Sequence, residues 1–180
     1  MRRLLCLVGV VLVFALSAAA QNAPKAEVAF GYSYVRANAG GEGFNLHGGS
    51  GQIAGNVNDW FGIVADFGGH RLSQTIGGVD VTGTLFTYAF GPRISYRKHE
   101  RVTPFVQALF GGARLRVEAL GTSESENAFA MALGGGFDVK VRQNVAIRLV
   151  QAEYVLTRFG GESQNNARIS AGIVFRWGGK

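Results

Sequence analysis

The stretch LFTYAFGPRISY, residues 85–96, places a large apolar side chain at almost every second position. One face of this stretch carries Phe86, Tyr88, Phe90, Pro92, Ile94 and Tyr96. The other face carries Leu85, Thr87, Ala89, Gly91, Arg93 and Ser95. Successive side chains of a β-strand point to opposite faces, so a period of two predicts a strand here. This strand would have one large apolar face and one face of mostly small or polar residues.

The same alternation recurs along the chain and predicts eight antiparallel strands. We expect them at 25–36, 44–55, 60–70, 79–96, 103–115, 127–141, 145–159 and 166–177. The second is the weakest, because its glycines have low β-propensity. In the seventh strand, strict alternation would place Arg148 on the opposite face from Gln151 and Glu153. A β-bulge near Leu149-Val150 would bring all three polar groups to one face.

The face of small residues distinguishes a membrane barrel from a soluble one. In a soluble barrel that face would meet water and would be rich in Lys, Glu, Thr and Gln. At 85–96, 128–141 and 168–177 it instead carries mainly Ala, Gly and Ser with isolated charges. Small side chains suit the narrow interior of an eight-stranded barrel, and the large apolar face then meets lipid. We therefore expect an all-β fold, an eight-stranded antiparallel up-and-down transmembrane β-barrel.

The start of the chain is typical of an export signal. Two arginines precede an uncharged apolar run at 4–20, which ends in three alanines. This order predicts a signal peptide at 1–20 that is cleaved after about Ala20. An uncleaved membrane anchor is the alternative, because the run is close to the lower length limit for a spanning helix. Residues 21–180 would then form a single barrel domain without cysteine.

The connections between the expected strands alternate in length. Those at 56–59, 97–102 and 142–144 are short, whereas those at 37–43, 71–78, 116–126 and 160–165 are mostly longer and polar or glycine-rich. Outer-membrane barrels combine tight periplasmic turns with longer extracellular loops, so both termini are expected in the periplasm. Two aromatic girdles are expected at the membrane interfaces, with Trp60, Tyr96 and Trp177 on the periplasmic side and Tyr34 and Phe159 on the outer side.

The final strand carries a motif that resembles the C-terminal β-signal of outer-membrane proteins. Ser170 is followed two residues later by Gly172, and Phe175 and Trp177 follow at alternate positions. The pattern departs from the usual one because three residues follow the final aromatic. The resemblance implies recognition by the barrel-assembly machinery of the outer membrane.

Two further segments extend this resemblance to the whole mature chain. Residues 59–67 and 90–93 are similar to recurring pieces of the outer membrane protein beta-barrel domain group. Over residues 21–180 the chain resembles the small OmpA/OmpX-type outer-membrane barrels. That resemblance implies a barrel in the cell outer membrane, surrounded by lipid, and it implies no ligand.

Several charged residues fall on the face of the strands that would point inward. We expect a polar network of Asp66, Arg93, Asp138, Lys140, Arg148, Glu153, Arg168 and Arg176, together with Glu27 and Gln107. Buried opposite charges require mutual pairing and hydrogen bonds, so such a network would fix the strand register. A polar track for a small solute is the alternative, but eight strands leave little room for one.

Composition and motifs argue against several classes of function. The net charge is +6, yet the cations are spread along the chain, which argues against nucleic-acid binding. No spaced ligand cluster indicates a metal, and no motif indicates a cofactor. The mature histidines are His47, His70 and His99, and none has a nucleophile in a catalytic arrangement along the predicted strands.

These observations favour a non-enzymatic outer-membrane protein with a structural or surface-interaction role and without a wide pore. An extracellular ligand, unknown in kind, would bind to the outer loops, because loops on rigid scaffolds carry function. Two alternatives stay open. One is a secreted or periplasmic soluble β-barrel that binds an apolar ligand, and the other is a lipid-modifying outer-membrane enzyme.

Overall fold

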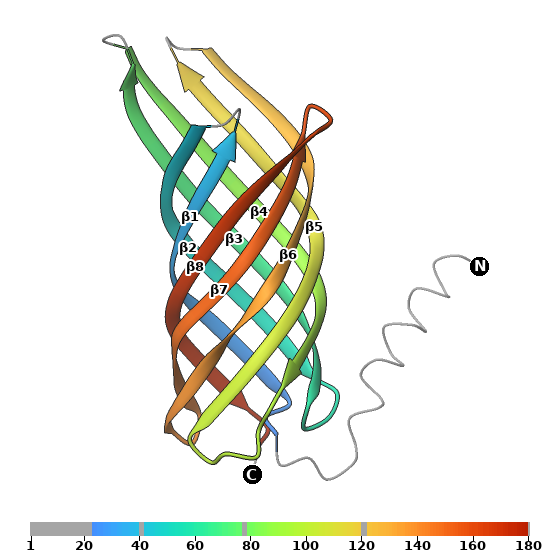
Figure 1. Ribbon diagram of the computed structural model, residues 1–180. Helices are drawn as coiled ribbons and strands as arrows, with labels where there is room; N and C mark the ends of the chain where they lie inside the picture. Colours follow the sequence, from blue (N-terminus) through green and yellow to red (C-terminus); the bar gives the residue numbers. More distant parts are fainter. Residues whose placement is uncertain (1–22, 40–41, 77–78, 120–121, 180) are drawn as a thin grey trace, which may run out of the picture.

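The structure is a closed barrel of eight antiparallel strands (Figure 1). The computed structural model describes residues 23–39, 42–76, 79–119 and 122–179. The strands are β1 (Ala26–Ala39), β2 (Glu42–Asn56), β3 (Phe61–Ile76), β4 (Val79–Ser95), β5 (Val102–Ala119), β6 (Thr122–Arg142), β7 (Val145–Phe159) and β8 (Glu162–Trp177). Each strand pairs with the next along the chain, and β8 pairs with β1. The expected all-β, eight-stranded fold is therefore confirmed.

The two ends of the barrel differ in what they contain. Ala26 at the start of β1 pairs with Trp177 at the end of β8, so we call this the terminal end. The opposite end, where β1–β2, β3–β4, β5–β6 and β7–β8 are joined, is the hairpin end (Figure 1). The expected signal peptide at 1–20 lies outside the described residues. Among the described residues, no helix is long and apolar enough to cross a membrane.

The strands run through most of the segments that were expected to be long outer loops, so that expectation is wrong. The β5–β6 pairing, for example, continues as far as Ala119 and Thr122. Pairing satisfies the backbone polar groups of these polar, glycine-containing arms, and this overrides their low strand propensity. At the β7–β8 hairpin, Gly160 and Gly161 both have positive φ, 56° and 85°, as a tight type I′ turn requires. The hairpin end therefore does not carry the longer connections, because the paired strands there are separated by two residues each, whereas those at the terminal end are separated by two to six.

The expected bulge in β7 is present. Phe137 of β6 pairs with Val150, and the next residue, Asp138, pairs with Arg148, so Leu149 is the extra residue. The pairing with β8 shifts register over the same segment, between Arg148 and Gln151. The shift brings the side chains on both sides of the bulge to the interior, where Arg148 and Gln151 are buried.

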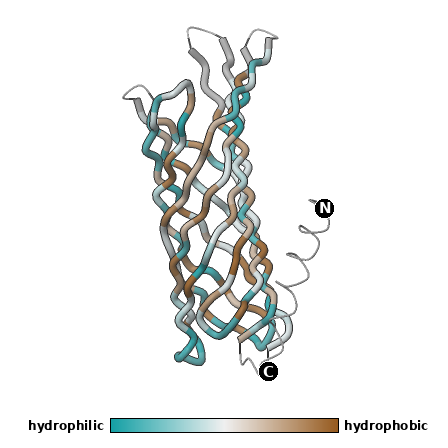
Figure 2. The backbone as a smooth tube through the Cα atoms, turned by 90° about the vertical axis from the view of Figure 1, so that its right-hand side faces the viewer, coloured by the Kyte–Doolittle hydropathy of each residue, from teal (hydrophilic) through white to brown (hydrophobic). Residues whose placement is uncertain are grey.

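The large apolar face of each strand points outward. Phe90 of β4 is 52% exposed and Phe137 of β6 is 37% exposed, and they belong to a set of large hydrophobic residues that covers all eight strands. Hydrophobic and hydrophilic residues alternate along the wall (Figure 2). The soluble-barrel alternative needed this face to point inward to hold a ligand, so the structure contradicts it.

One aromatic residue lies elsewhere than expected. Phe159, expected in the outer girdle, is buried in the barrel because it ends β7 at an inward position. Trp60, Tyr96 and Trp177 are exposed near the terminal end, as a girdle at that interface requires. Trp60 lies just before β3 rather than within it.

Apolar layers fill part of the interior. One cluster, near the hairpin end, contains Val35, Leu46, Leu85 and Phe159 with two buried alanines. A second cluster includes Val64 and Leu109 at mid-height, and a third is formed by Ala29, Ala146 and Val174. The buried polar groups lie among these layers, so the interior is packed rather than an open channel.

Candidate functional site

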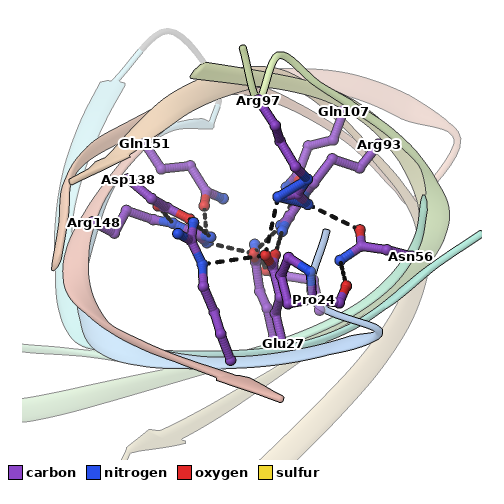
Figure 3. A network of polar contacts seen from close by, with 12 residues as sticks. Pro24, Glu27, Asn56, Arg93, Arg97, Gln107, Asp138, Arg148 and Gln151 are labelled. Atoms are coloured by element: carbon purple, nitrogen blue, oxygen red, sulfur yellow. Dashed lines mark hydrogen bonds and ion pairs between the residues drawn. The ribbon is translucent and has the colours of Figure 1, made fainter. Parts of the chain in front are cut away.

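The buried charged residues form one connected network inside the barrel, part of which Figure 3 shows. Four carboxylates and four arginines are buried, namely Glu27, Asp66, Asp138, Glu153, Arg93, Arg148, Arg168 and Arg176. The two charges balance. A balanced set is what burial in a low-dielectric interior requires, because an unpaired charge there is costly.

Glu27 of β1 is the acceptor at the terminal end of the network. Its carboxylate lies 3.2 Å from Nη1 of Arg97, 3.3 Å from Nε of Arg176 and 3.7 Å from Nη1 of Arg93. Arg97 comes from the β4–β5 turn and also donates to Oδ1 of Asn56. Burial lowers the pKa of the Arg97 guanidinium, and the adjacent Glu27 carboxylate opposes that shift. One carboxylate therefore holds three strand ends together.

Asp138 of β6 binds two arginines. Nε of Arg148 donates to its Oδ1 at 2.8 Å and Nη2 to its Oδ2 at 3.2 Å, a bidentate pair. Arg176 of β8 donates to the same Oδ2 at 3.2 Å. Because Arg176 also pairs with Glu27, it links β6 to β1 across the interior.

Three glutamines connect the charged groups. Gln52 donates to Asp66 at 2.7 Å and accepts from Arg93 and Arg148. Gln107 accepts from Arg93 and donates to Glu153. Gln151 accepts from Arg148 and donates to the same carboxylate. A carboxamide both donates and accepts, so it extends a network without adding charge.

The part of the network nearer the hairpin end is centred on Arg168 of β8. Its Nη1 donates to Asp66 of β3 at 2.8 Å, and its Nε donates to Glu153 of β7 at 2.7 Å. Asp66 and Glu153 therefore share one cation, which joins strands that are not neighbours in the sheet.

Phe105 of β5 is the aromatic member of the site. It is buried, and the guanidinium carbons of Arg93 and Arg148 each lie 4.5 Å from its ring centroid. A cation over an aromatic ring is attracted by the ring quadrupole, most strongly where water is excluded. The ring therefore stabilises two like charges at once.

A serine–histidine contact lies next to this network, on the side of the hairpin end. Nε2 of His70 is 2.9 Å from Oγ of Ser33, and Oγ of Ser170 is also 2.9 Å from Oγ of Ser33. Strand periodicity did not indicate this pair, because the strand expected to end at His70 in fact continues to Ile76. Ser33 is completely buried and His70 is 1% exposed, so a substrate has no access to the pair.

The interior cavities are small. One, beside Gln52 and Arg148, has a volume of about 10 Å³, and another, beside His70 and Thr87, about 20 Å³. Such volumes hold about one water molecule each. A larger cavity of about 760 Å³ lies at the terminal end, lined by Asp59, Lys140 and Arg176 among others. It is a vestibule at the mouth of the barrel.

The structure does not place Lys140 in the buried network, contrary to expectation. Lys140 is exposed and lines the vestibule, because it lies two residues from the end of β6. The partners that were not expected in the interior are Gln52, Phe105, the partly buried Arg97 and the Ser33–His70–Ser170 group, whereas Gln151 was expected on the same face as Arg148 and Glu153. Inward strand parity indicates Gln52, Phe105 and Ser33, whereas Arg97 comes from a turn and has no such signal.

The residues of the resembled β-signal lie along β8. Ser170 is buried against Ser33, and Trp177 is half exposed at the terminal end. Gly172 faces Gly31 across the β1–β8 seam, and a Cβ atom at Gly172 would lie 2.1 Å from the carbonyl oxygen of Phe30. The seam therefore closes tightly where glycine is required. Within the described residues, no cluster of three His, Cys, Asp or Glu side chains could hold a metal ion.

Comparison with known proteins agrees with this architecture. The model of the family described as outer membrane protein beta-barrel domain matches residues 6–176. Comparison with curated protein sequences gave no significant match.

Solved structures share the fold at low sequence identity. Neisserial surface protein A matches with a TM-score of 0.68 and 14% identity, over 86% of this chain and 99% of that one. Ail, the attachment invasion locus protein of Yersinia pestis, in complex with the heparin analogue sucrose octasulfate, matches with a TM-score of 0.60 and 20% identity, over 83% and 97%. The N-terminal barrel of Pseudomonas aeruginosa OprF matches with a TM-score of 0.52 and 15% identity, over 85% and 99%. With the family model covering nearly the whole barrel, the chain belongs to the outer membrane protein beta-barrel domain family, whose members lie in the outer membrane.

Proposed function

We propose that this protein is a closed, non-enzymatic scaffold of the outer membrane that presents its hairpin end to the outside. The observation that carries the proposal is the filled interior. Four carboxylates and four arginines, linked by glutamines, occupy the core, and the cavities beside them have volumes of about 10 and 20 Å³. A hydrated ion or a sugar needs a wider path than this.

The absence of turnover is part of the same proposal. The Ser33–His70 pair has the atoms of a nucleophile and a base, but both residues are buried and Ser33 is also bonded to Ser170. A nucleophile must reach its substrate, so we interpret the pair as a structural link between β1, β3 and β8. Unaltered lipid A after overexpression is the expected result, and altered acylation would contradict it.

Surface interaction is assigned to the paired arms at the hairpin end. β5 and β6 are paired out to Ala119 and Thr122, which gives this arm a regular backbone. Rigid arms of this kind present side chains in fixed positions to a partner outside the cell. The neighbour Ail was solved with a sulfated sugar analogue, which makes an anionic extracellular ligand a reasonable first probe.

The route to the membrane completes the proposal. Residues 1–20 act as a signal peptide cleaved after about Ala20, and the barrel-assembly machinery reads Ser170, Gly172, Phe175 and Trp177 on β8. The exposed edge residue Trp177 and the tight seam at Gly172 support this, because both belong to the strand that closes the sheet. Mass spectrometry of the purified protein would locate the cleavage site.

Conductance across a planar bilayer tests the closed interior. Native protein should show no steady conductance. The variant Arg93→Ala/Arg148→Ala should show cation-selective steps, because it widens the lumen and leaves Glu27 and Asp138 with fewer cations. The matched control is Arg101→Ala/Arg142→Ala, which removes the same charge from exposed positions at the terminal end. Steady conductance by the native protein, at the level of the interior variant, would refute the proposal.

A further inference from the structure

Besides Arg116, which lies two residues nearer the hairpin tip on β5, four arginines lie on the outward face of alternate strands near the hairpin end. They are Arg36 of β1, Arg71 of β3, Arg114 of β5 and Arg158 of β7, and all are exposed. Each shares its face with apolar residues of the same strand that point away from the barrel, such as Phe67 four residues before Arg71. We call this set the arginine belt.

The strand register places the arginine belt at one level around most of the barrel. On β2, Arg36 pairs with Asn45 and Arg71 pairs with His47, two residues away. On β4 and β6, the partners of successive belt arginines are again two residues apart, namely Thr84 and Phe86 and then Asn127 and Phe129. Strands of a small barrel are tilted, so partners offset in this way lie at similar heights.

Below the arginine belt, the outward face carries no charge down to the terminal end. Among the described outward positions of the strands in this band, none is Asp, Glu, Lys or Arg. From Phe61 to Arg71 along β3, a rise of about 3.3 Å per residue at a tilt of about 40° gives a height of roughly 25 Å. That height equals the apolar band of outer-membrane barrels, about 25 Å. The arginine belt therefore lies at the edge of the hydrocarbon region.

Acidic residues of the same hairpins avoid the outward face at this level. The exposed side chains Glu124, Glu126 and Glu162 occupy strand positions of inward parity. Asp80 and Glu118 lie further along the arms, toward the hairpin tips. The wall at the edge of the apolar band therefore presents positive charge toward the surrounding lipid.

The guanidinium groups keep donors available for a ligand. Arg36 donates through Nη1 to Asn45, Arg114 through Nη2 to Ser125, and Arg158 through Nε to the carbonyl oxygen of Gly161. Each of these bonds uses one nitrogen of a group with five N–H donors. Planar, doubly donating guanidinium groups match the oxygen atoms of phosphate.

We propose that the arginine belt binds the phosphate groups of anionic lipid in the leaflet around the hairpin end. The belt projects sideways from the wall, at the depth where lipid headgroups begin, rather than upward from the hairpin tips. This favours a lipid ligand over a soluble polyanion. The inference concerns the outer wall, so it does not depend on whether the interior is closed.

Native mass spectrometry of the protein in neutral detergent tests this. Diphosphorylated lipid A and phosphatidylcholine are titrated separately, and the apparent Kd for each is measured. Native protein should prefer lipid A by at least about tenfold, and Arg36→Gln/Arg71→Gln/Arg114→Gln/Arg158→Gln should lose that preference. An Arg→Lys version at the same positions should retain part of it, because charge remains without bidentate geometry.

The control is Lys25→Gln/Lys98→Gln/Arg101→Gln/Arg142→Gln, which removes the same charge from exposed positions at the terminal end and should keep the native preference. Heat-modifiable gel migration verifies folding. If the fourfold variant does not fold, Arg36→Gln/Arg158→Gln and Arg71→Gln/Arg114→Gln should each lose part of the preference. Equal losses in belt and control variants, or no native preference, would overturn the proposal. Belt-dependent binding of sucrose octasulfate without lipid A preference would instead identify a soluble polyanion site.

Discussion

Arg93 of β4 and Arg148 of β7 carry like charges, yet both donate to the carboxamide oxygen of Gln52 and both contact the ring of Phe105. Each arginine also has its own carboxylate, Glu27 for Arg93 and Asp138 for Arg148. Two cations can share neutral partners in this way only while each is paired elsewhere. The shared partners fix the spacing of β4 and β7, which are not neighbours in the sheet.

Phe105→Leu should destabilise the barrel by about 2–3 kcal/mol, because it removes two buried cation–π contacts and part of the core packing. Unfolding in urea with the protein in lipid vesicles measures the change in free energy of unfolding. Phe137→Leu is the matched control on the outward face, where the side chain contacts lipid, and it should cost less than about 1 kcal/mol. Equal losses for the two variants would show that the arginine contacts contribute nothing.

Gly172→Ala should prevent closure of the β1–β8 seam. Its Cβ would lie 2.1 Å from the carbonyl oxygen of Phe30, and backbone atoms cannot give way as a flexible side chain can. Gly55→Ala is the control, because a Cβ atom there has nothing within 4 Å. Refolding of purified protein in detergent, followed by heat-modifiable gel migration, measures closure without the assembly machinery. Normal refolding of the Gly172 variant would mean that the seam can widen.

Deletion of Leu149 should leave the barrel folded. Leu149 is the extra residue of the bulge, so its loss makes β7 regular while Arg148 and Gln151 both stay inward. Deletion of Ala152 is the comparison. However the register adjusts, Gln151 or Glu153 would then face lipid, because a slip of one residue reverses the faces of a strand. Gel migration before and after heating should separate the two deletions, and similar behaviour of both would contradict this account of the bulge.

Periodicity alone identified the strands and the direction of most side chains, because lipid outside and a narrow lumen inside impose a strict period of two. It also located the bulge, since Arg148 and Glu153 could not otherwise share a face. Periodicity could not predict which buried charged side chains contact one another. Arg168 contacts Asp66 from 102 residues away, and that contact depends on the registers of all the strands between them.

The hairpin arms were misjudged for a different reason. Their polar and glycine residues resemble loops locally, and only pairing along the full arm turns them into strand, as at Thr122 opposite Ala119. The same underestimate hid His70, which was taken to end its strand. Lys140 was expected in the interior but is exposed, because its parity along the strand predicts that it points inward but not how near it lies to the end of the barrel.

The distribution of charge gives β8 a second role beside closing the sheet. This strand supplies Arg168 and Arg176, the cations that join Asp66 to Glu153 and Glu27 to Asp138. The other seven strands alone contribute four buried carboxylates and only two buried arginines. The pairing of β8 with β1 therefore both completes the seam and neutralises the interior, so opening that seam would break hydrogen bonds and leave negative charge unpaired at the same time.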